Sequence, residues 1–280
     1  MSSENNNHIH IYFSAKSSPK TAQLFIKPRP GVQDNEQTAK IRKQIATEGE
    51  SYELYIKLGD ALRFQLRYAE GIEAYSEAIA LEPFRFEAYE GRGTCYMKTM
   101  RFKEALTDHL HFALNTEPAL YPFYRVGLCY YYNNAYDKAT AYFKKAEKFA
   151  IDEDFGEMII ACCFWECMCL LKQGKISEAQ DKAKSFPPDT EVGHHTSYRR
   201  AVFVLSGRFS LSEQLGELEN EQDELEYSTA MYGLLVYMNA IGTDSQILKE
   251  YRNKMLERDR FWACFGYIAA LNDKFSKWLP

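Results

Sequence analysis

Histidine is the residue type whose spacing first suggests metal chemistry in this chain. The six histidines fall into three pairs: His8 and His10, His109 and His111, and His194 and His195. A separation of two positions on a predicted helix turns His109 and His111 about 200° apart, so they cannot share one ion. The other pairs have no Cys or Asp at ligand spacing. We therefore expect no metal site, and a buried, hydrogen-bonded role for His109.

The cysteines form a second candidate cluster. Four of the seven stand close together, at Cys162, Cys163, Cys167 and Cys169. Zinc sites commonly bring paired cysteines together through loops, whereas these four lie on one predicted helix. No histidine is placed to activate a cysteine nucleophile. Because a buried Cys behaves as a small hydrophobic residue, we interpret the cluster as part of the core.

Motifs for nucleotide binding and for common hydrolases are absent from the sequence. There is no phosphate loop, no HExxH and no Gly-x-Ser-x-Gly. Gly91 and Gly93 form a GxG, but Tyr96 occupies the third glycine position and the segment lies in a predicted helix. We therefore expect no catalytic residue and no cofactor. An enzyme with a site in the C-terminal region is kept as an alternative from another functional class.

Composition and charge narrow the class of protein further. Aromatic residues make up 15% of the chain, which excludes a wholly disordered protein. The net charge of −5 argues against nucleic-acid binding. The longest apolar run, residues 158–171, is interrupted by Glu166 and is shorter than the ~18–20 residues that span a bilayer. An odd number of cysteines and no visible secretory signal predict a cytoplasmic protein with reduced thiols.

An internal repeat organises the middle of the chain. The sequence numbers of Gly59, Gly93 and Gly127 rise in equal steps of 34. Four further sets follow the same step: Tyr55, Tyr89 and Phe123; Tyr68, Phe102 and Tyr136; Gly71, Ala105 and Ala139; Tyr75, His109 and Phe143. A mid-helix Gly costs about 1 kcal/mol relative to Ala. Three equivalent glycines therefore indicate a close helix crossing that no larger side chain fits.

The stretch from Tyr55 to Pro83 resembles a tetratricopeptide repeat along its whole length. A period of about 34 residues is typical of that family. Two further copies begin at Tyr89 and Phe123, with Arg92, His109, Phe112 and Pro118 as departures from the family pattern. The resemblance implies an all-α, right-handed solenoid of helical hairpins. In each hairpin, large aromatic side chains fill the holes that Gly or Ala opens on the neighbouring helix.

A degenerate fourth repeat is expected from about Met158 to Pro188. A shift of 40 maps Tyr136 to Ile176, Ala139 to Ala179 and Cys129 to Cys169, and it places Cys167 in the glycine position. Further helices are predicted at residues 195–206, 221–241, 244–257 and 259–272. Between the first two of these, residues 213–226 hold seven acids and no Lys or Arg. A solvated helix face or loop is the favoured interpretation of that stretch, and an acidic docking patch is the alternative.

Three regions follow from these patterns. Residues 1–50 form an N-terminal arm, with candidate strands at 8–14 and 22–27, a turn at 17–20 and a helix at 36–46; a flexible arm is the alternative. Residues 51–188 form the solenoid, and residues 189–280 form a helical cap continuous with it. The apolar tail suits a helix that closes the end of a solenoid. The oligomeric state stays open, with a homodimer through the C-terminal helices as one alternative.

The family resemblance implies a concave groove lined by the first helix of each repeat. Helical spacing assigns the groove positions: Glu53, Ile56, Asp60, Arg63, Glu87, Glu90, Thr94, Met97, Tyr121, Tyr124, Arg125, Leu128 and Tyr131. Tyr and Arg are enriched in binding hot spots. The alternative for the tyrosines, and for Tyr132 beside them, is packing against the fourth repeat.

The charges in this groove predict the kind of partner. Arrays that clamp acidic chaperone tails present Lys, Asn and Arg where this chain has Ile56, Asp60, Gly91, Tyr121 and Arg125, so only Arg125 matches. Acidic groove residues would repel an acidic tail. We therefore predict a non-enzymatic scaffold that binds a neutral to basic peptide or partner helix. The alternative is a peptide-sensing regulatory module whose C-terminal helices repack on binding.

Overall fold

The structure is a computed structural model that describes residues 11–13, 24–26, 33–260 and 262–276. The chain divides into two compact units, Met1–Pro118 and Ala119–Pro280. We describe each unit by itself and call them unit 1 and unit 2. The boundaries at residues 50 and 188 stay a prediction.

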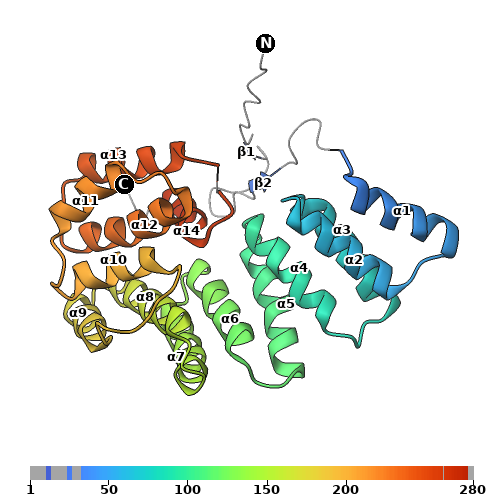
Figure 1. The fold of residues 1–280 in the computed structure, drawn as a ribbon, viewed down its shortest axis with the longest axis horizontal. Helices are drawn as coiled ribbons and strands as arrows, with labels where there is room; N and C mark the ends of the chain where they lie inside the picture. The colour runs from blue at the N-terminus through green and yellow to red at the C-terminus, as the bar shows by residue number, and fades with distance from the viewer. Residues whose placement is uncertain (1–10, 14–23, 27–32, 261, 277–280) are drawn as a thin grey trace, which may run out of the picture. The chain divides into compact units, whose positions relative to one another are not determined.

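Within its described residues, unit 1 contains two short strands followed by helices α1 to α5 (Figure 1). Strands β1 (Ile11–Phe13) and β2 (Leu24–Ile26) pair antiparallel, with Tyr12 opposite Phe25. The turn expected at 17–20 and the pair His8 and His10 lie outside the described residues. The helices are α1 (Glu36–Glu48), α2 (Tyr52–Phe64), α3 (Tyr68–Leu81), α4 (Glu87–Lys98) and α5 (Phe102–Asn115). They contain the first two repeats, as hairpins α2–α3 and α4–α5.

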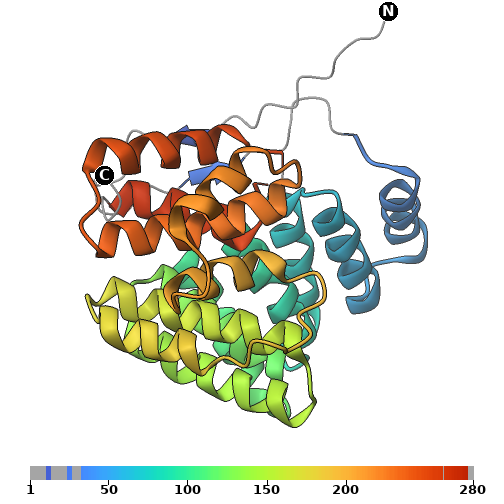
Figure 2. The same cartoon turned by 60° about the vertical axis from the view of Figure 1, so that its left-hand side comes forward.

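Unit 2 contains the remaining helices. The third and fourth repeats are the hairpins α6 (Leu120–Tyr132) with α7 (Tyr136–Asp152) and α8 (Gly156–Lys172) with α9 (Ile176–Ser185). The C-terminal helices are α10 (Thr196–Leu205), α11 (Leu211–Glu219), α12 (Glu224–Ala240), α13 (Ser245–Glu257) and α14 (Phe265–Ser276). Helices α10 and α12 both pack against α8, and the red and orange C-terminal helices stack beside it in Figure 2. The predicted all-α solenoid class is confirmed for this chain.

The four hairpins share one turn geometry that carries the repeat register. Leu66, Met100 and Asn134 have φ of 59°, 57° and 60°, and their sequence numbers rise in the same steps of 34 as those of the repeat glycines. Gly174, with φ of 74°, is the equivalent turn residue of the fourth hairpin. The step from Asn134 to Gly174 is 40, which is the shift that the sequence predicted for the fourth repeat. Only Gly adopts this left-handed backbone without steric cost.

The close helix crossings expected at the repeat glycines are present. A Cβ added to Gly59 would lie 2.7 Å from the Tyr75 ring, and one added to Gly127 would lie 2.7 Å from the Phe143 ring. In the fourth repeat the position equivalent to Phe143 holds Ala183, and the glycine position holds Cys167. Both are fully buried. In this repeat the larger of the two packed side chains, Cys167, lies on the first helix and the smaller, Ala183, on the second. The core therefore stays filled without an aromatic ring.

The second repeat has a histidine where its neighbours have an aromatic ring. His109 is buried against Gly93, as expected, but neither ring nitrogen has a hydrogen-bond partner among the described residues. This corrects the prediction of a hydrogen-bonded side chain. Burial lowers the pKa of His109 to about 3, because the charged ring cannot be solvated. His109 is thus a neutral core residue.

The cysteine cluster belongs to the core of unit 2, as predicted. All four side chains on α8 are buried, and the Cys167 thiol donates to the Ala179 carbonyl oxygen at 3.5 Å. Burial raises the pKa of the Cys162 thiol well above its ordinary value, so it is a poor nucleophile. Among the described residues, no three His, Cys, Asp or Glu side chains come together to hold a metal ion.

Two features of the C-terminal region differ from the sequence prediction. Helix α11 (Leu211–Glu219) is not among the predicted helix ranges; it overlaps the acidic stretch 213–226, interpreted as a solvated helix face or loop, and Ser210 caps it by accepting from the Glu213 amide at 3.5 Å. Helix α14 begins at Phe265 rather than near 259, because the chain first makes a turn in which the Trp262 amide donates to the Asp259 carbonyl oxygen at 3.2 Å. None of the helices in the described ranges is long and apolar enough to span a bilayer.

Candidate functional site

In unit 1, helices α2 and α4 pack against each other and carry the predicted groove positions of the first two repeats. The side chains of Glu53 and Glu87 are 58% and 64% exposed. Five more positions are half-buried and reach the surface in part: Ile56, Asp60, Arg63, Glu90 and Thr94. This set forms a mostly acidic surface, which we call the α2/α4 face.

Met97 does not belong to the α2/α4 face. Its side chain is completely buried in unit 1. Helical spacing alone put it on the same side of α4 as Glu90 and Thr94, but it lies further along the helix, where the helix is covered. The structure therefore removes Met97 from the residues that a ligand can reach.

Besides Arg63, a second basic side chain of this protein lies against the α2/α4 face. Arg85, in the loop before α4, donates from Nη1 to Glu53 Oε1 at 2.5 Å. Its guanidinium carbon lies 3.8 Å from the centre of the Tyr52 ring. The hydrogen bond from Arg85 lowers the pKa of Glu53. A guanidinium bound at this position thus contacts both the Glu53 carboxylate and the Tyr52 ring.

The Tyr75 side chain shows how the repeat core supports this face. Its hydroxyl donates to Asp60 Oδ1 at 2.7 Å, and Arg63 donates to the same oxygen at 3.3 Å. The Tyr75 ring is so close to α4 that a Cβ on Gly91 would overlap it. Gly91 is therefore a packing residue, and the GxG of Gly91 and Gly93 follows from helix contacts rather than from nucleotide binding.

Arg92, a departure from the family pattern, has a structural partner. Its guanidinium donates to both Asp108 oxygens, at 2.7 and 2.9 Å, and to Ser76 at 3.2 Å. A bidentate Arg–carboxylate pair is among the stronger polar contacts in proteins. The usual Leu is thus replaced by an ion pair that joins α4 to α5 and α3, and Arg92 is not free to bind a ligand.

Two exposed aromatic residues of unit 1 were missed by the sequence analysis. Phe64, the last residue of α2, is 80% exposed, and Phe84, beside Arg85, is 86% exposed. Neither residue belongs to the sets that recur every 34 positions. An aromatic residue outside those sets is the sequence signal that could have identified them. Large exposed aromatic side chains are typical contact residues of a binding surface.

In unit 2 the predicted groove positions of the third repeat are mostly covered. Leu128 is fully buried, Tyr124 accepts a hydrogen bond from Trp165 Nε1 at 2.8 Å, and the Tyr131 hydroxyl meets that of Tyr232 at 2.5 Å. These three side chains are not open to a ligand. Tyr121 remains exposed and Arg125 is half-buried. The packing alternative therefore describes Tyr131, whose ring centre lies 5.0 Å from that of Trp165 in the fourth repeat.

The C-terminal helix α14 is anchored to this covered surface by buried polar groups. Asp273 forms an ion pair with Lys172 of α8 and accepts from the Tyr232 hydroxyl at 3.0 Å. Asn272 donates to the Tyr132 carbonyl oxygen at 3.1 Å. Burial lowers the pKa of Lys172 to about 8 and raises that of Asp273. Helices α12 and α14 thus both contact the side of α6 and α8 that carries the predicted groove positions, which we call the inner side.

Comparison with known proteins identifies the repeat. Residues 56–111, which run from α2 into α5, match the tetratricopeptide repeat family model. This match and the repeated hairpins show that the chain contains tetratricopeptide repeats, and proteins built from such repeats bind protein or peptide partners. No curated protein matches the chain.

Solved structures supply a comparison of the fold. A tetratricopeptide repeat protein from Parabacteroides merdae ATCC 43184 is 15% identical with a TM-score of 0.54, covering 84% of this chain and 89% of that chain. YrrB, a tetratricopeptide repeat protein with an unusual peptide-binding site, is 17% identical with a TM-score of 0.46, covering 85% of this chain and 98% of that chain. At these identities the comparison shows a similar fold only, and this conclusion rests on the Parabacteroides merdae structure.

Proposed function

We propose that this protein is a non-enzymatic scaffold that binds a peptide or partner helix on the α2/α4 face. The proposal rests on the position of Arg85, whose contacts with Glu53 and Tyr52 indicate a place where a basic side chain can bind. The exposed rings of Phe64 and Phe84 add apolar contact area in the same unit. We place the protein in the cytoplasm, since its seven free cysteines suit a reducing compartment.

The partner proposed for this face is neutral to basic. Glu53, Asp60, Glu87 and Glu90 outnumber Arg63 and Arg85 on or beside the face. An acidic peptide would meet an excess of carboxylates over basic groups and be repelled, whereas a basic peptide would gain Coulomb attraction that salt screens. We therefore expect a basic peptide to bind more tightly than an acidic peptide of equal length, with an affinity that falls as the salt concentration rises.

The test is fluorescence anisotropy with matched basic and acidic peptides. Changing both Glu53→Gln and Glu87→Gln should weaken binding of the basic peptide by about three- to tenfold, because exposed charges attract a ligand only modestly through water. The control is Glu178→Gln, which removes an exposed carboxylate from the first turn of α9 in unit 2. Equal binding of both peptides, or an equal effect of the control, would contradict the proposal.

A second candidate function rests on the buried anchor of α14. The module would sense a peptide by repacking its C-terminal helices, because the Lys172–Asp273 pair holds α14 against the inner side of the third and fourth repeats. Small-angle scattering with and without the basic peptide tests this candidate. An unchanged scattering curve at saturation would leave the rigid scaffold as the function.

The apolar residues of α14 bear on the oligomeric state. Tyr267, Ile268 and Leu271 are buried within unit 2, which supports a capping role for this helix. Light scattering on the purified protein would distinguish this cap from a homodimer formed through the C-terminal helices.

A further inference from the structure

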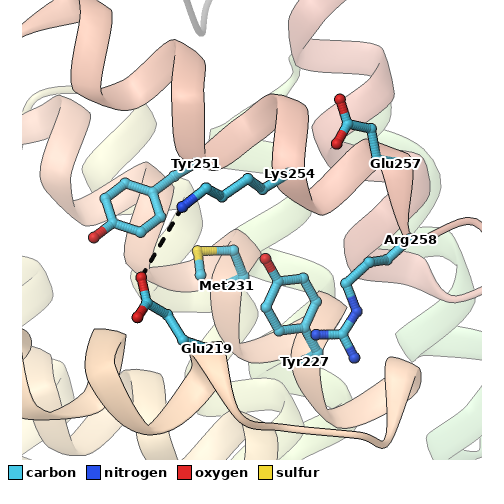
Figure 3. A pocket seen from close by; sticks show the side chains of 7 residues that line it. All are labelled: Glu219, Tyr227, Met231, Tyr251, Lys254, Glu257 and Arg258. Atoms are coloured by element: carbon cyan, nitrogen blue, oxygen red, sulfur yellow. Dashed lines mark ion pairs between the residues drawn. The ribbon is translucent and has the colours of Figure 1, made fainter.

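A pocket of about 480 Å³ lies within unit 2, between the end of α11, the first turns of α12 and helix α13 (Figure 3). Tyr227 and Met231 are buried in its floor, and Tyr251 of α13 forms a half-buried wall. These side chains give the pocket an aromatic and thioether interior. Such a surface suits an aliphatic chain or a cation that lies over a tyrosine ring.

One of the two basic side chains at the pocket is fixed in place. The Arg258 guanidinium lies 3.8 Å from the centre of the Tyr227 ring and donates to the Glu221 carbonyl oxygen at 2.7 Å. It serves to close one end of the pocket. An anionic ligand would therefore find Arg258 already engaged, and it would face the carboxylates of Glu219 and Glu257.

The other basic side chain is held only weakly. Lys254 Nζ lies 4.0 Å from Glu219, and the two side chains are 63% and 61% exposed. The ammonium also lies 5.7 Å from the centre of the Tyr251 ring. An ion pair this exposed is weak, because water screens the charges and both side chains lose freedom when they pair. Lys254 thus shows that the rim takes a cation, and another cation can replace it at little cost.

The surroundings of the pocket carry a negative charge. The stretch from 213 to 226 holds seven acids, among them Glu219 at the rim. Some are paired within the unit, as Glu217 is with Arg200 and Glu224 with Arg260. The acids still outnumber these cations, so the surface around the pocket attracts a basic segment.

We propose that this pocket receives a lysine or arginine side chain from a basic segment of a partner protein. The ligand cation takes the place of Lys254 beside Glu219 and the Tyr251 ring, and its aliphatic stem lies on Met231. The acidic stretch then contacts the flanking residues of the segment. This site lies on different helices from the α2/α4 face, so it can be tested independently of the function proposed for that face.

The Met231 methyl group provides a local probe of the proposal. The protein is labelled with ¹³C at its methionine methyl groups, and the Met231 signal is assigned with Met231→Leu. A blocked peptide of alternating Arg and Gly is titrated, beside a matched peptide of alternating Glu and Gly. The Met231 signal should shift and saturate with the Arg peptide only, while that of Met158, on α8, stays in place.

Substitutions at the rim sharpen the test. Lys254→Ala removes the internal competitor and should tighten binding of the Arg peptide by about two- to fivefold, whereas Glu257→Gln should weaken it by a similar factor. Lys249→Ala is the matched control, since Lys249 is an exposed lysine of α13 outside the pocket.

Three results would overturn the proposal: a Met231 signal that does not move, an equal shift with the Glu peptide, or the same affinity change from Lys254→Ala and Lys249→Ala. The Glu53→Gln and Glu87→Gln variant separates the two sites. If it weakens the binding measured by anisotropy while the Met231 shift saturates at the same peptide concentration as in the wild type, the α2/α4 face and the pocket bind basic segments independently.

Discussion

The inner sides of the repeats differ between the two units although the repeat scaffold is the same. In unit 1, α2 and α4 present carboxylates that stay exposed, such as Glu53 and Glu87. In unit 2, α6 presents aromatic side chains, and Tyr124 and Tyr131 are buried by Trp165 and Tyr232. The inner side is thus exposed where it carries carboxylates, and it is covered by later helices of the chain where it carries aromatic side chains.

The covered surface depends on polar contacts that are costly to break. The side chains of Asp273 and Lys172 are almost completely buried, so each charge needs the other. The open face has no such requirement, because its charges are solvated. This contrast predicts large effects of substitutions in unit 2 and small effects on stability in the α2/α4 face.

The largest effect is expected from Asp273→Ala. It leaves the buried Lys172 ammonium without its carboxylate, which should lower the free energy of unfolding by about 3–5 kcal/mol in urea denaturation. The double variant Lys172→Met and Asp273→Leu is the control, since it removes both charges and should recover much of the loss. A loss below about 1 kcal/mol for Asp273→Ala would show that the pair does not anchor α14.

A smaller effect is expected where the repeats pack tightly. Gly127→Ala should destabilise the protein by about 1–3 kcal/mol, because the new methyl group would lie 2.7 Å from the Phe143 ring. Gly216→Ala on α11 is the matched control: it meets no atom within 4 Å and should stabilise the helix by about 1 kcal/mol. Thermal unfolding of both variants checks the difference in sign, and equal shifts would contradict the tight crossing.

The smallest effect at neutral pH is expected from His109→Phe. An aromatic ring like those of Tyr75 and Phe143 in the first and third repeats removes two unpaired nitrogens and should stabilise the protein by about 1–2 kcal/mol. The pKa of His109 is lowered to about 3, against 6.5 for the ordinary side chain, so the unfolded state binds more protons between these values. Wild-type stability therefore falls as the pH drops below 6.5.

The His109→Phe variant should lose this dependence, so its advantage should grow as the pH falls from 6.5 towards 3 in denaturation experiments. Glu166 of unit 2 supplies the opposite case, because burial raises its pKa to about 7 from 4.5. Its contribution to stability falls as the pH rises between those values. Glu166→Gln should therefore gain on the wild type towards neutral pH, and a common trend in both variants would contradict these assignments.

Much of the local architecture could be predicted from the sequence. The constant repeat period identified the hairpins, and the six extra positions before the fourth repeat placed Cys167 in the glycine position. Helix spacing also identified α10, α12 and α13 to within a few positions. These features depend on contacts between neighbouring helices, whose residues keep a constant separation along the chain.

The exposure of the inner side could not be predicted in the same way. Tyr124 occupies the repeat position of Ile56 and Glu90, which are half-buried, and Tyr131 occupies that of half-buried Arg63 and buried Met97. Nothing in the third repeat itself distinguishes a binding residue from a packed one. Their partners, Trp165 and Tyr232, lie on later helices. The same applies to the pocket, whose walls come from three separate helices.

The sequence by itself determined the repeat, its register and the acidic character of α2 and α4, because periodic residues report on neighbours in the chain. Only the tertiary structure decided that α12 and α14 contact the third and fourth repeats and that Lys172 pairs with Asp273. Such contacts join segments far apart in the sequence, and they depend on how whole helices pack rather than on any periodic pattern.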